Sequence, residues 1–320
     1  MDYVYNLISD WDLTDEISSW LRNRSLEQKI LYLQEGADLY YHDKDTDDIY
    51  WGDDFSIDEL IDIWIKPNLD KDNNIKTAFV SLWCWNSSIE KDIFDKIWNE
   101  YGKIYYFGVD SSMSMLDSSI KNLKDVKNVN KKYICADFST NVFKRELTHM
   151  TINYDKRVFA FLSNTFWNIN PTNIIDILYN LLKKWERIWL DVRLRKWIKA
   201  KDDMSLFNMY NKYISEKEKI FFLPLKRYWV SFDSWKLVLS THIENSLWAI
   251  RFDYWFLFTK KTKIHAKNEE IIVLPEEIIK LQQIYAYDPN LLVKFFDEHW
   301  FRLIKSQKKW YRWHFIFEKI

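Results

Sequence analysis

The chain has 320 residues, enough for one large domain or two small ones, and its 46 Lys and Arg nearly balance its 47 Asp and Glu. This balance argues against a protein held to nucleic acid mainly by phosphate contacts, and no apolar run reaches the roughly 18 residues of a membrane span. Two cysteines exclude a disulfide framework, and the N-terminus has no basic signal-peptide region, so we expect a cytoplasmic protein.

Residues 1–74 are predicted to be mostly helical. Ser56 and Glu59 stand three residues apart ahead of an apolar stretch, a capping-box pattern that opens a short helix. Pro67 ends this helix, and a polar linker at residues 70–74 follows. We therefore expect a helical N-terminal region ahead of a differently patterned segment.

From residue 75 onward, short apolar runs alternate with helical stretches. Strands are predicted at residues 77–82, 104–109, 133–136, 157–163 and 187–194, with helices at 88–101, 113–123 and 172–184. Strands that are apolar on both faces and alternate with helices are typical of a parallel sheet buried on both faces. Residues 75–194 are therefore expected to form an α/β core.

The last third of the chain is less regular. Residues 195–288 contain one long strand, expected at 249–258. A helix is predicted at 290–299, followed by two strands at 301–305 and 313–318 that a polar turn joins.

Glycine and tryptophan are present in abnormal amounts. Gly occurs 4 times and Trp 18 times, and together they reach about 7% of the chain, which is the usual share of glycine alone. Trp83 and Trp85 follow the first predicted strand in a turn, where glycine lets the backbone adopt positive φ and approach a ligand. Trp185 and Trp300 each stand between a helix end and a strand, another glycine position. Trp310 and Trp313 are expected in a hairpin turn, which also favours glycine.

Other tryptophans have a different setting. Trp64 and Trp255 have apolar neighbours and fit a hydrophobic core. We hypothesise that most of the remaining Trp codons are UGA, which some genetic codes read as Trp and others as Gly. The alternative, a truly Trp-rich protein, leaves the glycine deficit unexplained. It also predicts that literal indoles at 83 and 85 crowd or close the pocket beside the turn.

With glycine at 83 and 85, residues 77–194 resemble the class I S-adenosylmethionine-dependent methyltransferases. The sequence TAFVSLWCWN at 77–86 matches the family's first motif, whose backbone lines the methionine part of the cofactor. Asp110 ends the second strand, where the family has an acid that accepts both ribose hydroxyls. Asp137 falls where the family places an acid or amide near the adenine amino group. The resemblance implies a cofactor site of Trp83, Cys84, Trp85, Asp110, Ser111, Met115, Asp137, Phe138 and Asn164.

The same resemblance implies the fold. The C-terminal helix and strand hairpin match the family's last two strands, of which the final one is antiparallel. We therefore expect an α/β fold with a Rossmann-like seven-stranded methyltransferase sheet. Its parts are a helical N-terminal region (1–74), a cofactor-binding core (75–194), an inserted substrate region (195–288), and a C-terminal helix and hairpin (289–320) that complete the sheet.

A dinucleotide-binding Rossmann domain is the competing interpretation. It requires G-x-G-x-x-G with an acid about 20 residues further on. Ser88 stands at the third glycine position even when both Trp are read as Gly, and Asp110 lies beyond the required spacing. The terminal hairpin also favours the methyltransferase.

A narrower similarity concerns the loop FLSNTFWNINP at residues 161–171, with the helix and strand after it. It is similar to the histidine Nα-methyltransferase family of ergothioneine synthesis. By that resemblance Asn168 holds the amino group of the substrate, and tyrosines such as Tyr40 and Tyr210 complete the substrate site. The family reads the imidazole with an acid and a hydroxyl, whereas this chain has Gln, Gln and Ile at 282–284. This departure puts histidine specificity in question and leaves methyl transfer intact.

The expected function is methyl transfer from S-adenosylmethionine to a small amine or amino-acid-like substrate. Such an in-line displacement needs alignment and exclusion of water and no catalytic triad, and the sequence names no clear base. The histidines and cysteines lack ligand spacing, so we expect no metal, and neither a membrane nor nucleic acid as partner. Two alternatives stay open: a non-catalytic protein of the same fold with an occluded pocket, and an RNA or protein methyltransferase.

Overall fold

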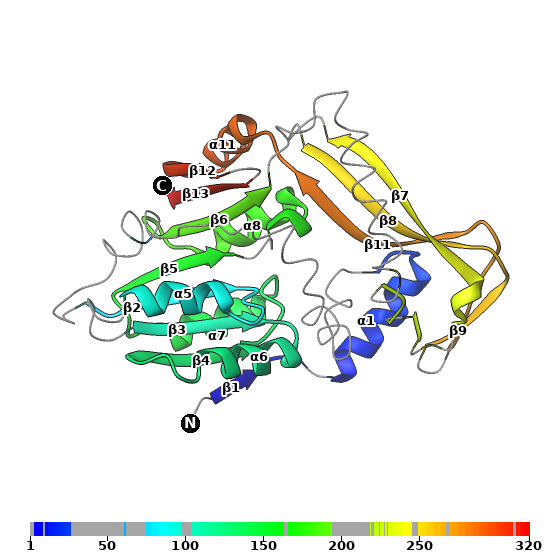
Figure 1. The fold of residues 1–320 in the computed structure, drawn as a ribbon, viewed down its shortest axis with the longest axis horizontal. Coiled ribbons are helices and arrows are strands. Elements are labelled where there is room, and N and C mark those ends of the chain that lie inside the picture. Colours follow the sequence, from blue (N-terminus) through cyan, green and yellow to red (C-terminus); the bar gives the residue numbers. More distant parts are fainter. Residues whose placement is uncertain are drawn as a thin grey trace.

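The computed structural model describes residues 3–8, 10–26, 61, 75–97, 104–162, 166–193, 218, 221–223, 225, 226, 228, 230–244, 249–266, 269–309 and 312–320. Tyr40, Asn164 and Tyr210 lie outside these residues, as does most of the predicted helical region. Within the described part, a large sheet with flanking helices lies beside a smaller sheet (Figure 1).

The large sheet has eight strands in the order β1-β4-β3-β2-β5-β6-β13-β12. Their bounds are β1 (Tyr3–Asn6), β2 (Thr77–Leu82), β3 (Ile104–Asp110), β4 (Val129–Cys135), β5 (Lys156–Phe161), β6 (Arg187–Arg193), β12 (Phe301–Lys309) and β13 (Arg312–Lys319). Strands β1 to β6 pair in parallel, and β13 is antiparallel to both neighbours. The seven strands after β1 in this order confirm the predicted methyltransferase sheet.

Helices cover both faces of this sheet. They are α5 (Ser88–Ile97), α6 (Met113–Leu123), α7 (Asn141–Met150), α8 (Pro171–Leu181) and α11 (Pro289–Glu298). Successive residues of β2 point to opposite faces: Ala78 and Val80 join the cluster packed by α7, α8 and α11, whereas Phe79 joins the cluster packed by α5 and α6. All six residues of β2 are buried, as the both-face apolar pattern predicted.

The N-terminal residues depart from the prediction. Residues 3–6 form the edge strand β1, parallel to β4, although the region was expected to be mostly helical. Four residues are too few to show a strand pattern, and β4 supplies the hydrogen bonds that fix them. The helix α1 (Asp10–Arg22) follows and packs Ile17 and Leu21 into the core of the smaller sheet.

The region after residue 194 is more regular than expected. Strands β7 (Trp235–Glu244), β8 (Ala249–Phe258) and β11 (Ile278–Ala286) form an antiparallel sheet, and β9 (Thr262–Ala266) pairs with β10 (Glu269–Val273). The predicted strand at 249–258 is confirmed as β8. One face of this sheet is apolar and packs its own cluster, and the other carries polar side chains.

A buried ion pair fixes the crossing from α8 to β6. Arg157 of β5 donates from Nε and from one terminal nitrogen to the two carboxylate oxygens of Glu186, both at 2.6 Å. The side chain of Arg157 is 4% exposed and that of Glu186 is 13% exposed. Glu186 also accepts the backbone N–H of Lys183, so it closes the turn that contains Trp185.

We expect Glu186→Ala to lower the free energy of unfolding by about 3 kcal/mol, because it leaves the Arg157 charge buried without its partner. Urea denaturation measures the loss. Asp95→Ala is the control, since Asp95 pairs with Lys91 on an exposed helix face and its loss should cost less than about 1 kcal/mol. Equal losses in the two variants would contradict the structural role of the buried pair.

Candidate functional site

A cavity of about 440 Å³ lies where the carboxyl ends of the parallel strands face β11. In open α/β sheets, ligands bind at this edge. Its walls come from the β2, β3 and β4 ends, from the start of α8, from β11 and from the residues after α1. The lining residues are Trp83, Asp110, Ser111, Ala136, Asp137, Phe138, Ser139, Asn168, Ile169, Asn170, Asn173, Ile177, Lys280, Leu281, Gln282, Gln283, Ser25 and Leu26.

Asp110 is the last residue of β3 and is 1% exposed. One carboxylate oxygen accepts the backbone N–H of Trp85 at 3.1 Å, and the other accepts that of Ser112 at 2.9 Å. Asp110 therefore ties the turn after β2 to the start of α6. Burial raises its pKa to about 7, and the backbone donors oppose that rise. A carboxylate at this strand end has the chemistry needed to accept ribose hydroxyls.

Asp137 and Phe138 form the adjoining wall. Asp137 accepts from both the backbone N–H and the hydroxyl of Ser139, at 2.9 and 2.5 Å. The ring of Phe138 lies 5.4 Å from that of Phe161 and 6.2 Å from that of Trp83. An aromatic wall beside a carboxylate suits a nucleoside base, so this end of the cavity fits the predicted cofactor.

Three predicted cofactor residues do not line the cavity. Cys84 is buried in the core, and burial raises the pKa of its thiol well above its usual value, so the thiol stays protonated. Met115 is buried on α6. Trp85 packs against the core of the smaller sheet. The side chains of residues 83–85 point in alternating directions along the turn. The sequence motif identified the backbone of this turn as part of the site but did not predict which side chains face the cavity.

The turn after β2 has glycine-like backbone angles. Among the described residues, eight non-glycine residues have positive φ, and four of these are tryptophans: Trp83 (60°), Trp85 (50°), Trp185 (70°) and Trp300 (67°). All four are positions that the sequence indicated as glycine sites. Trp313, which was also expected in a glycine-like turn, lies in β13 and has no positive φ, so that prediction is wrong. Trp310 lies outside the described residues. Positive φ is a genuine outlier for a bulky residue and is normal for glycine.

The contrast with core tryptophans supports this distinction. Trp189 and Trp235 lie in or at the start of strands, and both are buried. The Trp189 indole donates to Nδ1 of His314 at 3.2 Å. The prediction that Trp255 lies in a hydrophobic core is wrong: it is half-buried in β8, where its indole N–H donates to Ser240 at 2.8 Å. Trp64, for which the same was predicted, lies outside the described residues. Trp185 and Trp300, by comparison, are 57% and 60% exposed.

The indole of Trp83 occupies part of the cavity wall. It lines the cavity and also packs against the hydrophobic core of the smaller sheet. It therefore lies between the carboxyl ends of the parallel strands and the smaller sheet. A cavity of about 440 Å³ remains beside it, which is at the small end of the range for ligand pockets. The literal indole therefore narrows the site and does not close it.

Amide side chains line the far end of the cavity. Asn168, in the short helix η4 (Phe166–Asn168), has a buried Oδ1 with no hydrogen-bond partner among the described residues. Asn170 is already engaged, because its Oδ1 caps α8 through the backbone N–H and hydroxyl of Thr172. Asn168 therefore lines the cavity and keeps unused hydrogen-bonding capacity at its Oδ1.

The sequence did not identify the wall formed by β11. Here Lys280, Leu281, Gln282 and Gln283 line the cavity, and the pairing register shifts between Lys280 and Gln282. Such a bulge changes the direction of the side chains that follow. The backbone of Lys280 also pairs with residues 24–26, which brings Ser25 and Leu26 to the cavity. Only the break from the family pattern at 282–284 pointed to this strand.

Neither a metal-ligand group nor a membrane-spanning helix is seen in the described ranges. No group of three or more His, Cys, Asp or Glu is placed to hold a metal ion there. None of the described helices is both long and apolar enough to cross a membrane.

Comparison with known proteins finds a match to one family model, over part of the chain. Residues 85–194 match the model of a family described as histidine-specific methyltransferases that depend on S-adenosylmethionine. No curated protein matches the chain in sequence. A solved S-adenosylmethionine-dependent methyltransferase from Methanosarcina mazei is 11% identical, with a TM-score of 0.42 over 80% of this chain and 96% of that one. The 1,6-didemethyltoxoflavin N1-methyltransferase of Burkholderia thailandensis is 8% identical, with a TM-score of 0.41 over 96% of this chain and 90% of that one.

Proposed function

We propose that this chain, an S-adenosylmethionine-dependent methyltransferase, transfers a methyl group to a small amine or amino-acid-like substrate. The observation that carries the proposal is one cavity with two chemically different ends. Asp110, Asp137 and Phe138 line one end, and the amides of Asn168 and Gln283 line the other. A volume of about 440 Å³ suits small molecules better than a polymer end.

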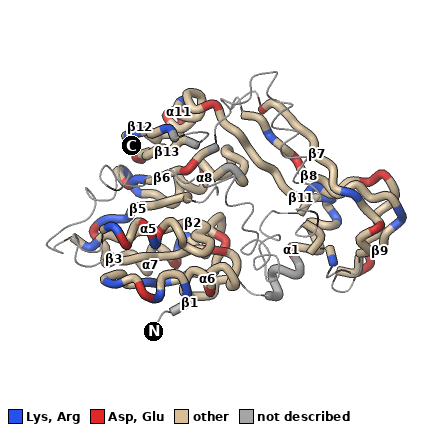
Figure 2. Tube along the Cα trace, in the orientation of Figure 1, with Lys and Arg blue, Asp and Glu red and all other residues tan. Residues whose placement is uncertain are grey.

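The charge distribution favours the same class of acceptor. Lys and Arg are interspersed with Asp and Glu over the described part of the chain, both around the large sheet and around the smaller sheet (Figure 2). The whole sequence carries a formal net charge of −1. Binding of RNA through phosphates requires a basic surface, so a small-molecule acceptor fits better.

Each end of the cavity has a distinct role in this proposal. Asp110 binds the ribose hydroxyls and Phe138 packs beside the adenine. When bound, the cofactor supplies an electrophilic methyl group on a sulfonium. Asn168 accepts a hydrogen bond from the substrate amine and so orients the nitrogen, which must be neutral to act as nucleophile. The walls from β11 and residues 25–26 exclude water from the reacting atoms.

We further propose that Trp83 and Trp85 are glycines in the source organism, encoded by UGA. Their positive φ angles and the Trp83 indole in the cavity wall support this reading. Glycine in the turn lets the backbone approach the methionine part of the cofactor. Calorimetry with S-adenosylhomocysteine tests the enzyme reading: a folded glycine-containing chain that binds none at millimolar ligand would leave the non-catalytic alternative.

Asn168→Ala tests the substrate end. We expect KM for the amine acceptor to rise by about tenfold, because the variant loses a hydrogen bond to the amine. Methyl transfer from radiolabelled S-adenosylmethionine to the twenty amino acids identifies the acceptor and then measures KM. The Kd of S-adenosylhomocysteine should not change, since Asn168 contacts the other end of the cavity.

Asn180→Ala is the matched control, because Asn180 is an exposed residue near the end of α8 that does not line the cavity. An unchanged KM in Asn168→Ala, with both variants folded, rules out this role for Asn168.

A further inference from the structure

Helix α6 supports the turn after β2 from behind. This turn, residues 83–87, leads into α5, and α6 packs on the same face of the large sheet as α5 (Figure 1). Asn122 of α6 donates from its amide nitrogen to the backbone carbonyl of Asn86 at 2.8 Å. The hydroxyl oxygen of Ser119, also on α6, lies 2.5 Å from that of Ser87. Helix α6 is therefore hydrogen-bonded to the last two residues of the turn.

The conformation of Ser87 depends on these contacts. Its φ is 56°, a left-handed conformation that is strained for a residue with a side chain, and the residue is 1% exposed. Besides Ser119, its hydroxyl contacts the hydroxyl of Tyr106 on β3 at 2.8 Å. Burial raises the pKa of Tyr106 well above its usual value, so that hydroxyl stays protonated and can donate. Three buried hydroxyls thus stabilise a backbone that Ser87 alone would rarely adopt.

The space beneath the turn is tightly filled. Gly108 of β3 lies there, and a Cβ at this position would meet the Tyr106 hydroxyl at 2.9 Å and Sγ of Cys84 at 3.1 Å. A larger residue at 108 would therefore displace the hydroxyl that bonds to Ser87. The sequence places one of its four glycines at this point.

The start of α6 is tied to Asp110. One carboxylate oxygen of Asp110 accepts the backbone N–H of Ser112, the N-cap residue of α6, and the other accepts that of Trp85 in the turn. The contacts form a closed circuit: from the turn to Asp110, from Asp110 to the start of α6, and along α6 back to the turn. Such a circuit fixes the separation between the Asp110 carboxylate and the turn.

We propose that Ser119 and Asn122 are positioning residues for the cofactor, because they hold residues 83–87 at the distance from Asp110 that S-adenosylmethionine requires. The turn leads into the N-terminus of α5, whose first backbone N–H groups attract an anion such as the carboxylate of the cofactor's methionine part. Ser119 and Asn122 are not among the described residues that line the cavity, so they act through the turn. This inference rests on cofactor binding and is independent of which amine is methylated.

The proposal separates the two parts of the cofactor. A turn that has lost its support must be ordered when the ligand binds, and this ordering lowers affinity. Only a ligand whose amino-acid part reaches the turn is affected. S-adenosylhomocysteine has that part, whereas 5′-methylthioadenosine keeps the adenosine and the sulfur and lacks it. A general loss of stability or of cavity shape would weaken both ligands alike.

Ser119→Ala and Asn122→Ala test this inference in the full chain, in the form that binds S-adenosylhomocysteine. We expect each variant to raise the Kd of S-adenosylhomocysteine by about fivefold to tenfold, the effect of one lost hydrogen bond. The Kd of 5′-methylthioadenosine should change by less than about twofold. Isothermal titration measures both constants. Asn122→Asp keeps the shape of the side chain, has no N–H to donate when ionised, and should match Asn122→Ala.

Each alanine variant has a matched control. Ser118→Ala removes a neighbouring hydroxyl that donates to the carbonyl of Ser114 within α6. Asn180→Ala removes an amide that donates at 2.8 Å to the carbonyl of Asp176 within α8. Both controls should bind the two ligands as tightly as the parent chain does.

Equal weakening of the two ligands, or unchanged binding of S-adenosylhomocysteine in either folded alanine variant, overturns this inference and leaves the methyltransferase proposal standing. If the parent chain binds neither ligand, the enzyme reading fails, and this inference fails with it.

Discussion

Glycine at positions 83 and 85 is expected to tighten binding of S-adenosylhomocysteine by about tenfold or more relative to the Trp-containing chain. The indole of Trp83 lines the cavity at the turn where the cofactor's methionine part is expected to lie. Removing it gives the ligand space and frees the backbone N–H groups of the turn to approach it. Isothermal titration of the two forms, made side by side, measures the difference.

Stability provides an independent readout at Trp185 and Trp300. Both have positive φ and are more than half exposed, so glycine relieves strain there while little packing is lost. We expect each Trp→Gly change to raise the free energy of unfolding by about 1 kcal/mol. Trp189→Gly and Trp235→Gly are the controls and should lower it by about 3–5 kcal/mol or more, because both indoles are buried in cores.

The gene decides the cause of this pattern. UGA codons at the four positive-φ positions and UGG at Trp189 and Trp235 are the expected result. UGG at all four contradicts the recoding hypothesis. In that case the indoles are genuine, and the chain holds four strained tryptophans for another reason.

Much of the core could be predicted from sequence because its signals are local. The strands β2, β3, β5 and β6 are short, mostly apolar runs, and their alternation with helices implies parallel pairing. The glycine-like turns were predicted in the same way, from the positions of tryptophans relative to the ends of predicted strands and helices. The φ angles at Trp83, Trp85, Trp185 and Trp300 agree with that reasoning.

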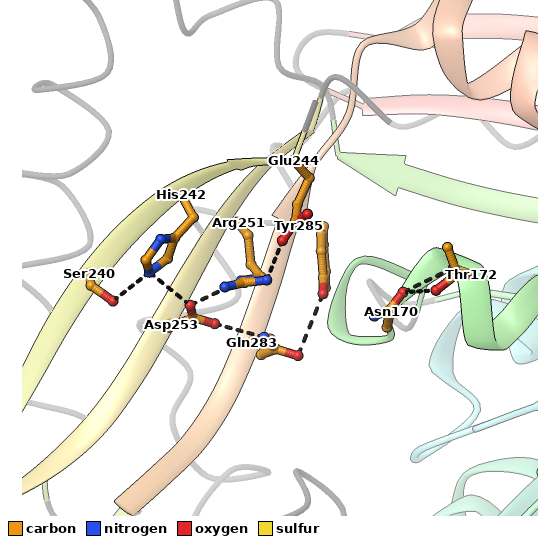
Figure 3. A network of polar contacts seen from close by, with 9 residues as sticks. All are labelled: Asn170, Thr172, Ser240, His242, Glu244, Arg251, Asp253, Gln283 and Tyr285. Atoms are coloured by element: carbon orange, nitrogen blue, oxygen red, sulfur yellow. Dashed lines mark hydrogen bonds and ion pairs between the residues drawn. The ribbon is translucent and has the colours of Figure 1, made fainter. Parts of the chain in front are cut away.

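What could not be predicted depends on contacts between distant parts of the chain. Strand β1 is too short to be recognised alone and is fixed by its pairing with β4. Strand β7 was not predicted, although it pairs with the predicted β8 over ten residues. The wall formed by Lys280 to Gln283 depends on a register shift in β11 that no local pattern shows. The orientation of the Gln283 amide depends on Asp253, thirty residues earlier, which accepts a hydrogen bond from its nitrogen (Figure 3).

Asp110→Asn is expected to weaken binding of S-adenosylhomocysteine by about 100-fold at pH 8. The ribose hydroxyls donate to an ionised carboxylate, and bonds to charged acceptors contribute about 1.5–3 kcal/mol each. The pH profile gives a second signature. Burial raises the pKa of Asp110 to about 7, so the carboxyl becomes protonated as the pH falls below that value and cannot accept both hydroxyls. Affinity of the native chain should then fall by up to about tenfold per pH unit, whereas the Asn variant should show a flat profile.

A Glu90 variant is the control that distinguishes titration of Asp110 in the binding site from titration of another buried acid. Burial also raises its pKa to about 7, and its carboxylate accepts from Ser81 at 2.5 Å, but it does not line the cavity. For both acids the folded state takes up a proton more readily than the unfolded state, so each lowers stability as the pH rises from about 4 to about 7. Glu90→Gln should remove its share of that stability slope and keep the pH dependence of binding. If Glu90→Gln instead flattens the binding profile, or Asp110→Asn leaves it intact, Asp110 is not the group that binds the ribose.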